Sequence, residues 1–167
     1  MKTSFLIAGA ITLVLTFILS YVYLTLIAAG FRKKYCPQTS PNLAQGLLLA
    51  GKSVAGLVLI SGIFPPIRDF LLVSASGTDP FSSAFWGFVF ICCCITGVFY
   101  VLLSLFEEWI SHKIFRGQSL VVELRENNLA VGLTRAAIIS VLAFTLLFSC
   151  GMFLQAFIPL PAIPNIR

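Results

Sequence analysis

The feature that most constrains this chain is the length of its uncharged stretches. Four such stretches follow one another, and only Lys52 interrupts one of them. They cover residues 3–31, 35–67, 80–106 and 136–166. A helix that spans a bilayer needs about 20 consecutive apolar residues, and each stretch is longer than that. The chain is therefore predicted to cross a membrane four times.

Composition agrees with this prediction. Only 10% of the residues are charged and 59% are hydrophobic, whereas soluble domains carry about 25% charged residues. A soluble domain, a disordered chain and a nucleic-acid-binding protein are excluded on this ground. We predict an all-α membrane protein that forms a single transmembrane domain over residues 1–167. Its helices are expected near residues 4–30, 42–64, 81–107 and 128–158. Pro65 and Pro66 should end or kink the second helix, which would leave residues 67–76 as a short segment on the outer surface.

The distribution of basic residues predicts the orientation. The first helix is followed by Arg32, Lys33 and Lys34, a stop-transfer pattern, so we interpret it as a retained helix and not as a removable signal peptide. The connections 31–41 and 108–127 together hold six basic residues, against three on the other side. Because cytoplasmic loops carry the excess of Lys and Arg, both termini are expected on the outer, periplasmic side.

An internal repeat is the most specific pattern in the sequence. Residues 42–50 read NLAQGLLLA and residues 128–136 read NLAVGLTRA, with six of nine positions identical. The repeat unit is interpreted as a two-helix hairpin, over about 4–76 and again over about 80–158. Each copy crosses the membrane an even number of times, so the copies should share one orientation, as parallel repeats related by an axis along the membrane normal.

Small residues within the repeat predict how the helices pack. In lipid, close backbone approach takes the place of apolar burial as the source of helix association. Gly46 and Ala50 form one small-xxx-small pair, and Gly132 and Ala136 form its counterpart. We therefore expect the second and fourth helices at the centre of the bundle, with the aromatic-rich first and third helices outside.

Two cations inside predicted spans are candidate functional residues, because charges within the membrane are costly and commonly functional. Arg135 borders the Gly132 face and is expected in the bundle interior. Three interpretations stay open for it: an ion pair with Glu107 or Glu108, contact with an anion, and interface anchoring. Lys52 lies away from the Gly46 face and is expected to snorkel or to contact another subunit.

Asn42 and Asn128 occupy matched positions where the second and fourth helices begin. Helix capping is one interpretation, since asparagine is a favoured N-cap residue. The other is a paired polar gate, with the helix N-termini favouring anions.

No residue is predicted to be catalytic, to bind a cofactor or to bind a metal. The run from Gly46 to Ser53 fits the phosphate-loop pattern, but it lies inside an apolar helix whose amides are already bonded. The one histidine, His112, lies in a charged stretch. The adjacent cysteines 92–94 point in different directions on a helix, and all five cysteines are interpreted as small apolar filler.

The repeated Asn-Leu-Ala motif, at 42–44 and again at 128–130 after Asn127, resembles the YjfL-like family. These are small bacterial inner-membrane proteins with four helices and a domain of unknown function. The resemblance covers residues from about 5 to 155 and implies a location in the bacterial inner (plasma) membrane. It brings no activity and no site residues with it.

Three functions stay open from the sequence. The first is a non-enzymatic protein, expected to be a homo-oligomer, that forms or gates a small path for an anion or a membrane lipid. The second is a structural or accessory subunit that docks a membrane or cytoplasmic partner protein through the mixed-charge stretch 107–126. The third is an intramembrane cysteine redox protein, which the spacing of the cysteines disfavours.

Overall fold

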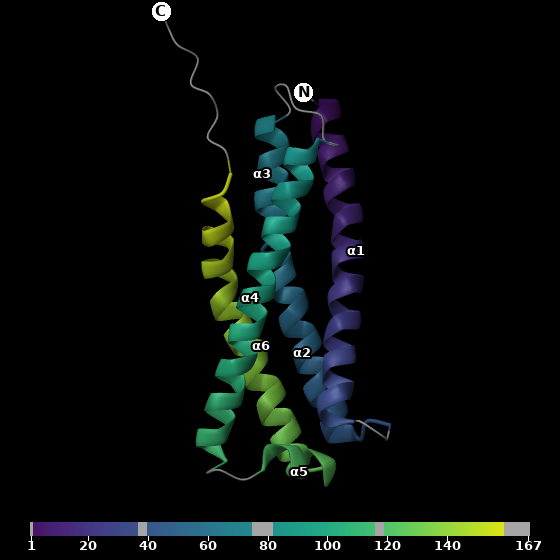
Figure 1. Cartoon of the computed structure of the whole chain (residues 1–167), viewed down its shortest axis with the longest axis vertical. Coiled ribbons are helices and arrows are strands. Elements are labelled where there is room, and N and C mark those ends of the chain that lie inside the picture. The colour runs from purple at the N-terminus through teal and green to yellow at the C-terminus, as the bar shows by residue number, and fades with distance from the viewer. Residues whose placement is uncertain (1, 37–39, 75–81, 116–118, 159–167) are drawn as a thin grey trace, which may run out of the picture.

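The computed structural model describes residues 2–36, 40–74, 82–115 and 119–158, and these residues form helices with no strand among them. Figure 1 shows the helices as a bundle elongated along one direction. Their bounds are α1 Lys2–Tyr35, α2 Leu43–Ser61, α3 Phe64–Ser74, α4 Ser83–Ile114, α5 Leu120–Arg125 and α6 Leu129–Gln155.

The prediction of four helices that are long and apolar enough to span a membrane is confirmed. Helices α1, α4 and α6 are each long and apolar enough to span a bilayer, and α2 with α3 makes up the remaining span, over Leu43–Leu72. α2 and α6 both begin at the end of the bundle where α5 lies, and α1 begins at the opposite end, where α6 finishes (Figure 1). This arrangement agrees with an even number of crossings, whereas the side of the membrane that each end faces stays a prediction.

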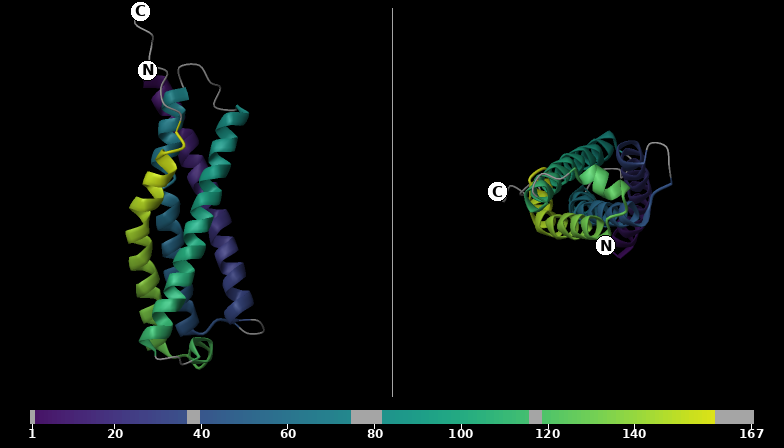
Figure 2. Two further views of the ribbon diagram at one scale, coloured as in Figure 1. Left: turned by 60° about the vertical axis from the view of Figure 1, so that its left-hand side comes forward. Right: turned by 90° about the horizontal axis from the view of Figure 1, so that it is seen from below.

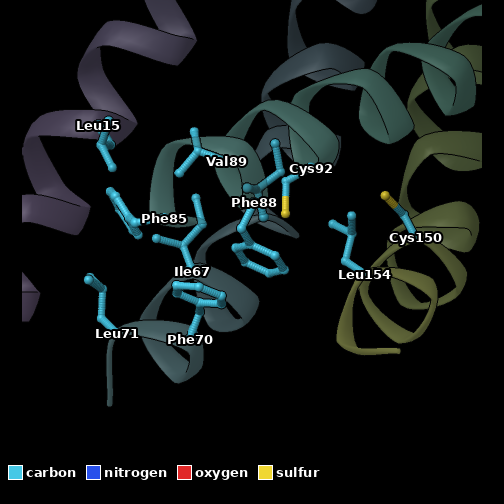
Figure 3. Packing of buried hydrophobic residues seen from close by; sticks show 11 residues of the cluster. Leu15, Ile67, Phe70, Leu71, Phe85, Phe88, Val89, Cys92, Cys150 and Leu154 are labelled. Atoms are coloured by element: carbon cyan, nitrogen blue, oxygen red, sulfur yellow. The ribbon is translucent and has the colours of Figure 1, made fainter. Parts of the chain in front are cut away.

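The expected surface segment after Pro65 and Pro66 is wrong. The two prolines lie in the first turn of α3, where a backbone N–H has no partner to lose. α3 therefore continues the course of α2 after a two-residue turn. Its side chains at 67, 70 and 71 are buried, because this helical spacing puts them on one face. Figure 3 shows them packed with Phe85 and Phe88 of α4.

The backbones of α2 and α6 approach each other closely at two glycines. A Cβ added at Gly132 would lie 2.5 Å from the carbonyl oxygen of Ala44, and one added at Gly51 would lie 2.6 Å from the Cα of Ala136. Gly132 and Ala136 thus lie in the interface that the small-residue pattern indicates.

On the α2 side, different residues form this interface from those predicted. A Cβ added at Gly46 would meet nothing within 4 Å, and Ala50 is exposed. The buried face of α2 instead includes Ala44, Leu48 and Gly51. The spacing of four and three residues puts these side chains on one face of the helix. That face is rotated away from the face of Gly46 and Ala50, which the repeat indicated.

Only α2 holds the central place predicted for two helices. It is the most buried span, α1 is the least buried, and α6 is no more buried than α4. The view along the bundle in Figure 2 shows the helices gathered around a common interior. The α1–α2 and α4–α6 interfaces are similar in extent, which suits two hairpins, but the duplication itself stays a prediction.

Candidate functional site

A carboxylate with no exposed surface lies at the centre of the candidate site. The Glu107 side chain on α4 is 0% exposed, and the Arg135 side chain on α6 is 1% exposed. Arg135 donates from Nε to Oε1 at 2.5 Å and from Nη2 to Oε2 at 3.0 Å. This two-pronged geometry is the strongest that arginine makes with a carboxylate. Of the interpretations left open for Arg135, the described contacts favour the ion pair, and the partner is Glu107.

Two more groups approach Glu107 in the interior. Ser111 donates from its hydroxyl to Oε1 at 3.1 Å, and Lys52 Nζ lies 3.7 Å from Oε2. The structure therefore places Lys52 inside the bundle, facing α4, and not at the lipid surface where snorkelling was expected. Its side chain is 11% exposed.

The position of Glu107 corrects the interpretation of its stretch. The sequence placed Glu107 at the end of the third span and at the start of a mixed-charge stretch, 107–126, that was considered for docking a partner. α4 continues to Ile114, which keeps Glu107 within the helix. The residue four positions on, Ser111, is buried on the same face. The beginning of the supposed docking stretch is therefore part of the interior.

Helix α1 joins this arrangement through its last turn. Arg135 Nη2 donates to the Tyr35 hydroxyl at 3.2 Å, and that hydroxyl donates to Glu108 Oε1 at 3.4 Å. Lys34 pairs with Glu108 in turn. Each of the four spans thus contributes at least one side chain to a continuous network, which we call the charge cluster. Its members are Lys34, Tyr35, Lys52, Glu107, Glu108, Ser111 and Arg135.

The charge cluster is not neutral. Three cations face two carboxylates, which leaves one positive charge over. A buried charge is strongly unfavourable unless it is paired and hydrogen-bonded. Arg135 meets this requirement fully through Glu107. Lys52 meets it less well, because the carboxylate oxygen nearest to it lies at 3.7 Å and already accepts from Arg135.

A cavity of about 660 Å³ lies beside Lys52, between α1 and α4. We call it the lateral groove. Most of its lining is apolar and comes from residues such as Leu19, Leu26, Ile27, Gly97, Val101 and Leu105. Lys34, Lys52 and Glu108 line it as well. The ends of α1 and α4 near the charge cluster lie apart in Figures 1 and 2, in keeping with a groove that these two helices flank.

Polar side-chain contacts bridge the groove at two levels among the described residues. The Tyr23 hydroxyl of α1 donates to the carbonyl oxygen of Cys93 on α4 at 3.1 Å. At the other level, Lys34 and the Tyr35 hydroxyl both contact Glu108. α1 is therefore joined to α4 at few points, while its packing against α2 is extensive.

The matched asparagines act at helix ends. Asn42 accepts from the Gln45 amide at 2.9 Å and donates to the Leu124 carbonyl at 2.8 Å. Asn128 accepts from the Val131 amide at 3.4 Å. These contacts favour helix capping over the polar gate.

A third asparagine contributes as well. Asn127 has a φ of 63°, in the left-handed region that asparagine tolerates, and its side chain accepts from the Ala44 amide at 3.0 Å. Asn42 and Asn127 thereby tie the start of α2 to the segment between α5 and α6.

The cysteines do not form a reactive cluster. All five are free, and Cys92 and Cys150 are fully buried in the apolar core in Figure 3. Cys36, just beyond α1, donates to Gln45 Oε1 at 3.2 Å, and burial raises the pKa of its thiol. Among the described residues no group of three or more His, Cys, Asp or Glu side chains is arranged to hold a metal.

Sequence reasoning missed three members of the charge cluster, namely Lys34, Tyr35 and Ser111. Lys34 was assigned to a basic loop, and Tyr35 was not considered. The signal that could have found them is the continuation of the helices. α1 extends to Tyr35 and α4 to Ile114, and Tyr35 and Ser111 lie on helix faces that turn inward.

Comparison with curated proteins found no match, and comparison with solved structures also found none. A family model described as Domain of Unknown Function (DUF350) matches residues 2–152, which is most of the chain and includes all four spans to within a few residues, and the protein belongs to this family.

Proposed function

We propose that this protein is a non-enzymatic integral membrane protein that holds an anionic lipid in the lateral groove, with the lipid phosphate beside Lys52. The observation that carries the proposal is the placement of a buried, incompletely paired lysine at the wall of a mostly apolar groove. An apolar channel with a few convergent polar groups is the usual form of a ligand site.

The dimensions of the groove suit a lipid tail. Its lining on α1 extends from Leu19 to Tyr35, which is about 24 Å at 1.5 Å per helical residue. One leaflet contributes about half of the 30 Å hydrocarbon core. An acyl chain of one leaflet could therefore lie along the groove, with its headgroup at the level of the charge cluster.

The charge of the site favours an anion. The cluster carries one uncompensated positive charge, and the carboxylate that pairs with Lys52 among the described residues also pairs with Arg135. A phosphate that approached Lys52 would supply the missing countercharge without breaking the pair between Arg135 and Glu107. Charge-assisted hydrogen bonds of this kind are stronger than neutral ones.

The test compares Lys52→Met with Lys113→Met in delipidated protein. Both variants lose one positive charge, but Lys113 is exposed in the last turn of α4 and does not line the groove. Native mass spectrometry during titration with phosphatidylglycerol or phosphatidylcholine measures the bound lipid. We expect the wild type and Lys113→Met to prefer phosphatidylglycerol, and Lys52→Met to bind it about tenfold more weakly. Equal affinity of all three proteins for phosphatidylglycerol would refute the proposal.

The remaining sequence predictions are kept as part of the proposal. They are the bacterial inner membrane, the periplasmic termini, the YjfL-like relationship and the homo-oligomer. The same mass spectra report the number of chains per particle, and tagging each terminus in intact cells reports its side of the membrane.

A further inference from the structure

The contacts of Glu108 bear on how a headgroup would enter the groove. This residue lines the groove, and its carboxylate pairs with Lys34 and accepts from the Tyr35 hydroxyl at 3.4 Å. The side chains of Lys34 and Glu108 are 50% and 33% exposed. The pair therefore lies at the mouth of the site, whereas Glu107 lies behind it in the interior.

We propose that Glu108 is an internal competitor for the lipid headgroup, a carboxylate that occupies Lys34 until a lipid phosphate displaces it. The inference rests on the proposed function, since it assigns a role within the same groove. A carboxylate and a phosphate use the same partners, namely an ammonium group and a hydroxyl donor. Glu108 already engages one of each, from Lys34 and Tyr35, at the end of the groove where the headgroup would lie.

The two carboxylates of the cluster differ in whether they could be displaced. Glu107 is held by two bonds from Arg135 and one from Ser111, with no exposed surface. Releasing it would strand a buried arginine, which is strongly unfavourable. Glu108 pairs with an exposed lysine, and pairs of that kind contribute little stability because water competes for both partners. Exchange of an anion is therefore expected at Glu108 and not at Glu107.

The class of lipid expected in the groove follows from the positive charges that face it once Glu108 is displaced. With Glu108 swung away, Lys34 and Lys52 face the groove together. A lipid whose phosphodiester carries one negative charge and whose distal group is neutral would meet both ammonium groups without adding a cation. A zwitterionic lipid would bring its own ammonium into the same space, where like charges repel. The site is therefore expected to select phosphatidylglycerol over phosphatidylcholine, and removal of Glu108 should sharpen that selection.

The experiment compares Glu108→Gln with Glu126→Gln in the same lipid titration. Both variants remove one negative charge at the same end of the bundle, but Glu126 is exposed beyond α5 and does not line the groove. We expect Glu108→Gln to bind phosphatidylglycerol about fivefold more tightly, the largest gain expected from releasing a partly exposed ion pair. Glu126→Gln should match the wild type.

Each outcome is informative. Unchanged or weaker binding by Glu108→Gln would overturn the competition while leaving the lipid site in place. An equal gain in both variants would also overturn it, because overall surface charge would then be the cause. Wild-type protein that binds no phosphatidylglycerol would remove the proposed function, and the competition with it.

Discussion

Neutralising Glu107 should destabilise the protein far more than neutralising its neighbour Glu108. Glutamine has nearly the shape of glutamate, so Glu107→Gln removes charge and leaves packing in place. Arg135 and Lys52 would then face each other in the interior without a counter-charge. Lys52 Nζ lies 3.7 Å from Glu107 Oε2, and at that separation an effective dielectric constant of about 20 gives an attraction of about 4 kcal/mol.

The net loss of stability depends on the cost of leaving Arg135 and Lys52 buried without a carboxylate partner. Measured cases in which one partner of a buried pair is removed show losses of about 3–5 kcal/mol. We expect Glu107→Gln to fall in that range, since Glu107 is 0% and Arg135 only 1% exposed. Glu108→Gln is the matched control. Its partner Lys34 is 50% exposed, and exposed pairs contribute at most about 1 kcal/mol.

The assay is equilibrium unfolding of delipidated protein in mixed micelles, in which SDS is the denaturant and helix content is followed by circular dichroism. A loss for Glu107→Gln no larger than that for Glu108→Gln would refute the reasoning. A double variant tests whether the loss of stability in Glu107→Gln comes from the unpaired cations and not from another cause. Glu107→Gln combined with Lys52→Met removes one of the two stranded cations and should recover part of the stability. Strictly additive losses would mean that Lys52 and Glu107 are not coupled.

The interface between α2 and α6 and the thiol beyond α1 give two further predictions. Gly132→Ala should lower the free energy of unfolding by about 1–3 kcal/mol, since its Cβ would lie 2.5 Å from a backbone oxygen of α2, whereas Gly46→Ala should leave it nearly unchanged; equal effects would contradict the register described. Cys36 should react slowly with N-ethylmaleimide at pH 8, because the thiolate is the reactive form and burial raises the pKa of the Cys36 thiol. Its reaction rate should continue to rise above the pH at which the rate of free cysteine levels off. Peptide-resolved mass spectrometry measures this rate. A pH dependence equal to that of free cysteine would contradict the burial of the Cys36 thiol.

The number and approximate position of the spans could be predicted because the bilayer imposes them. Hydrocarbon excludes charge over a fixed thickness, so uncharged runs mark the spans almost directly. The same physics explains the error after Pro65. A proline removes a donor and is costly inside a helix, but it is tolerated in the first turn, and sequence alone did not reveal that a new helix starts at Phe64.

The faces of the helices were harder to predict than their ends. Small residues indicate that helices approach closely, but they do not say which of several small residues lies at the contact. On α2 both Gly46 and Gly51 were available, and only Gly51 meets α6. The choice depends on how the large side chains of four helices fit together, which is a property of the assembled bundle.

The partner of Arg135 was predictable as one of two adjacent glutamates, but its burial was not. The sequence placed Glu107 at the end of the third span and at the start of the mixed-charge stretch 107–126, and α4 continues through it to Ile114. Whether Glu107 faces the interior depends on how α2 and α6 pack against α4. In the assembled bundle it contacts Lys52 and Arg135 and so joins three of the four spans.

The charge cluster also explains why a groove can exist in such a small bundle. Apolar contact gives transmembrane helices no drive to associate, because lipid offers the same contact. α2 and α6 are held by close backbone approach, and α4 is held to both through Glu107. Among the described residues, the hydrogen bonds and ion pairs that join α1 to α4 come from Tyr23 and from the last turn of α1, so the space between these two helices need not close.

On the predicted repeat alignment, the charged residues of the interior have no charged counterparts in the other copy. Arg135 corresponds to Leu49, Lys52 to Ile138, and Glu107, in the register of the first and third helices, to Tyr23. The helix caps at Asn42 and Asn128 are retained in both copies. Features that build a hairpin are thus shared, whereas those that build the charge cluster differ. Among the described residues, the site made from these differences lies where α4 approaches α2, and Lys52 lines the groove on that side.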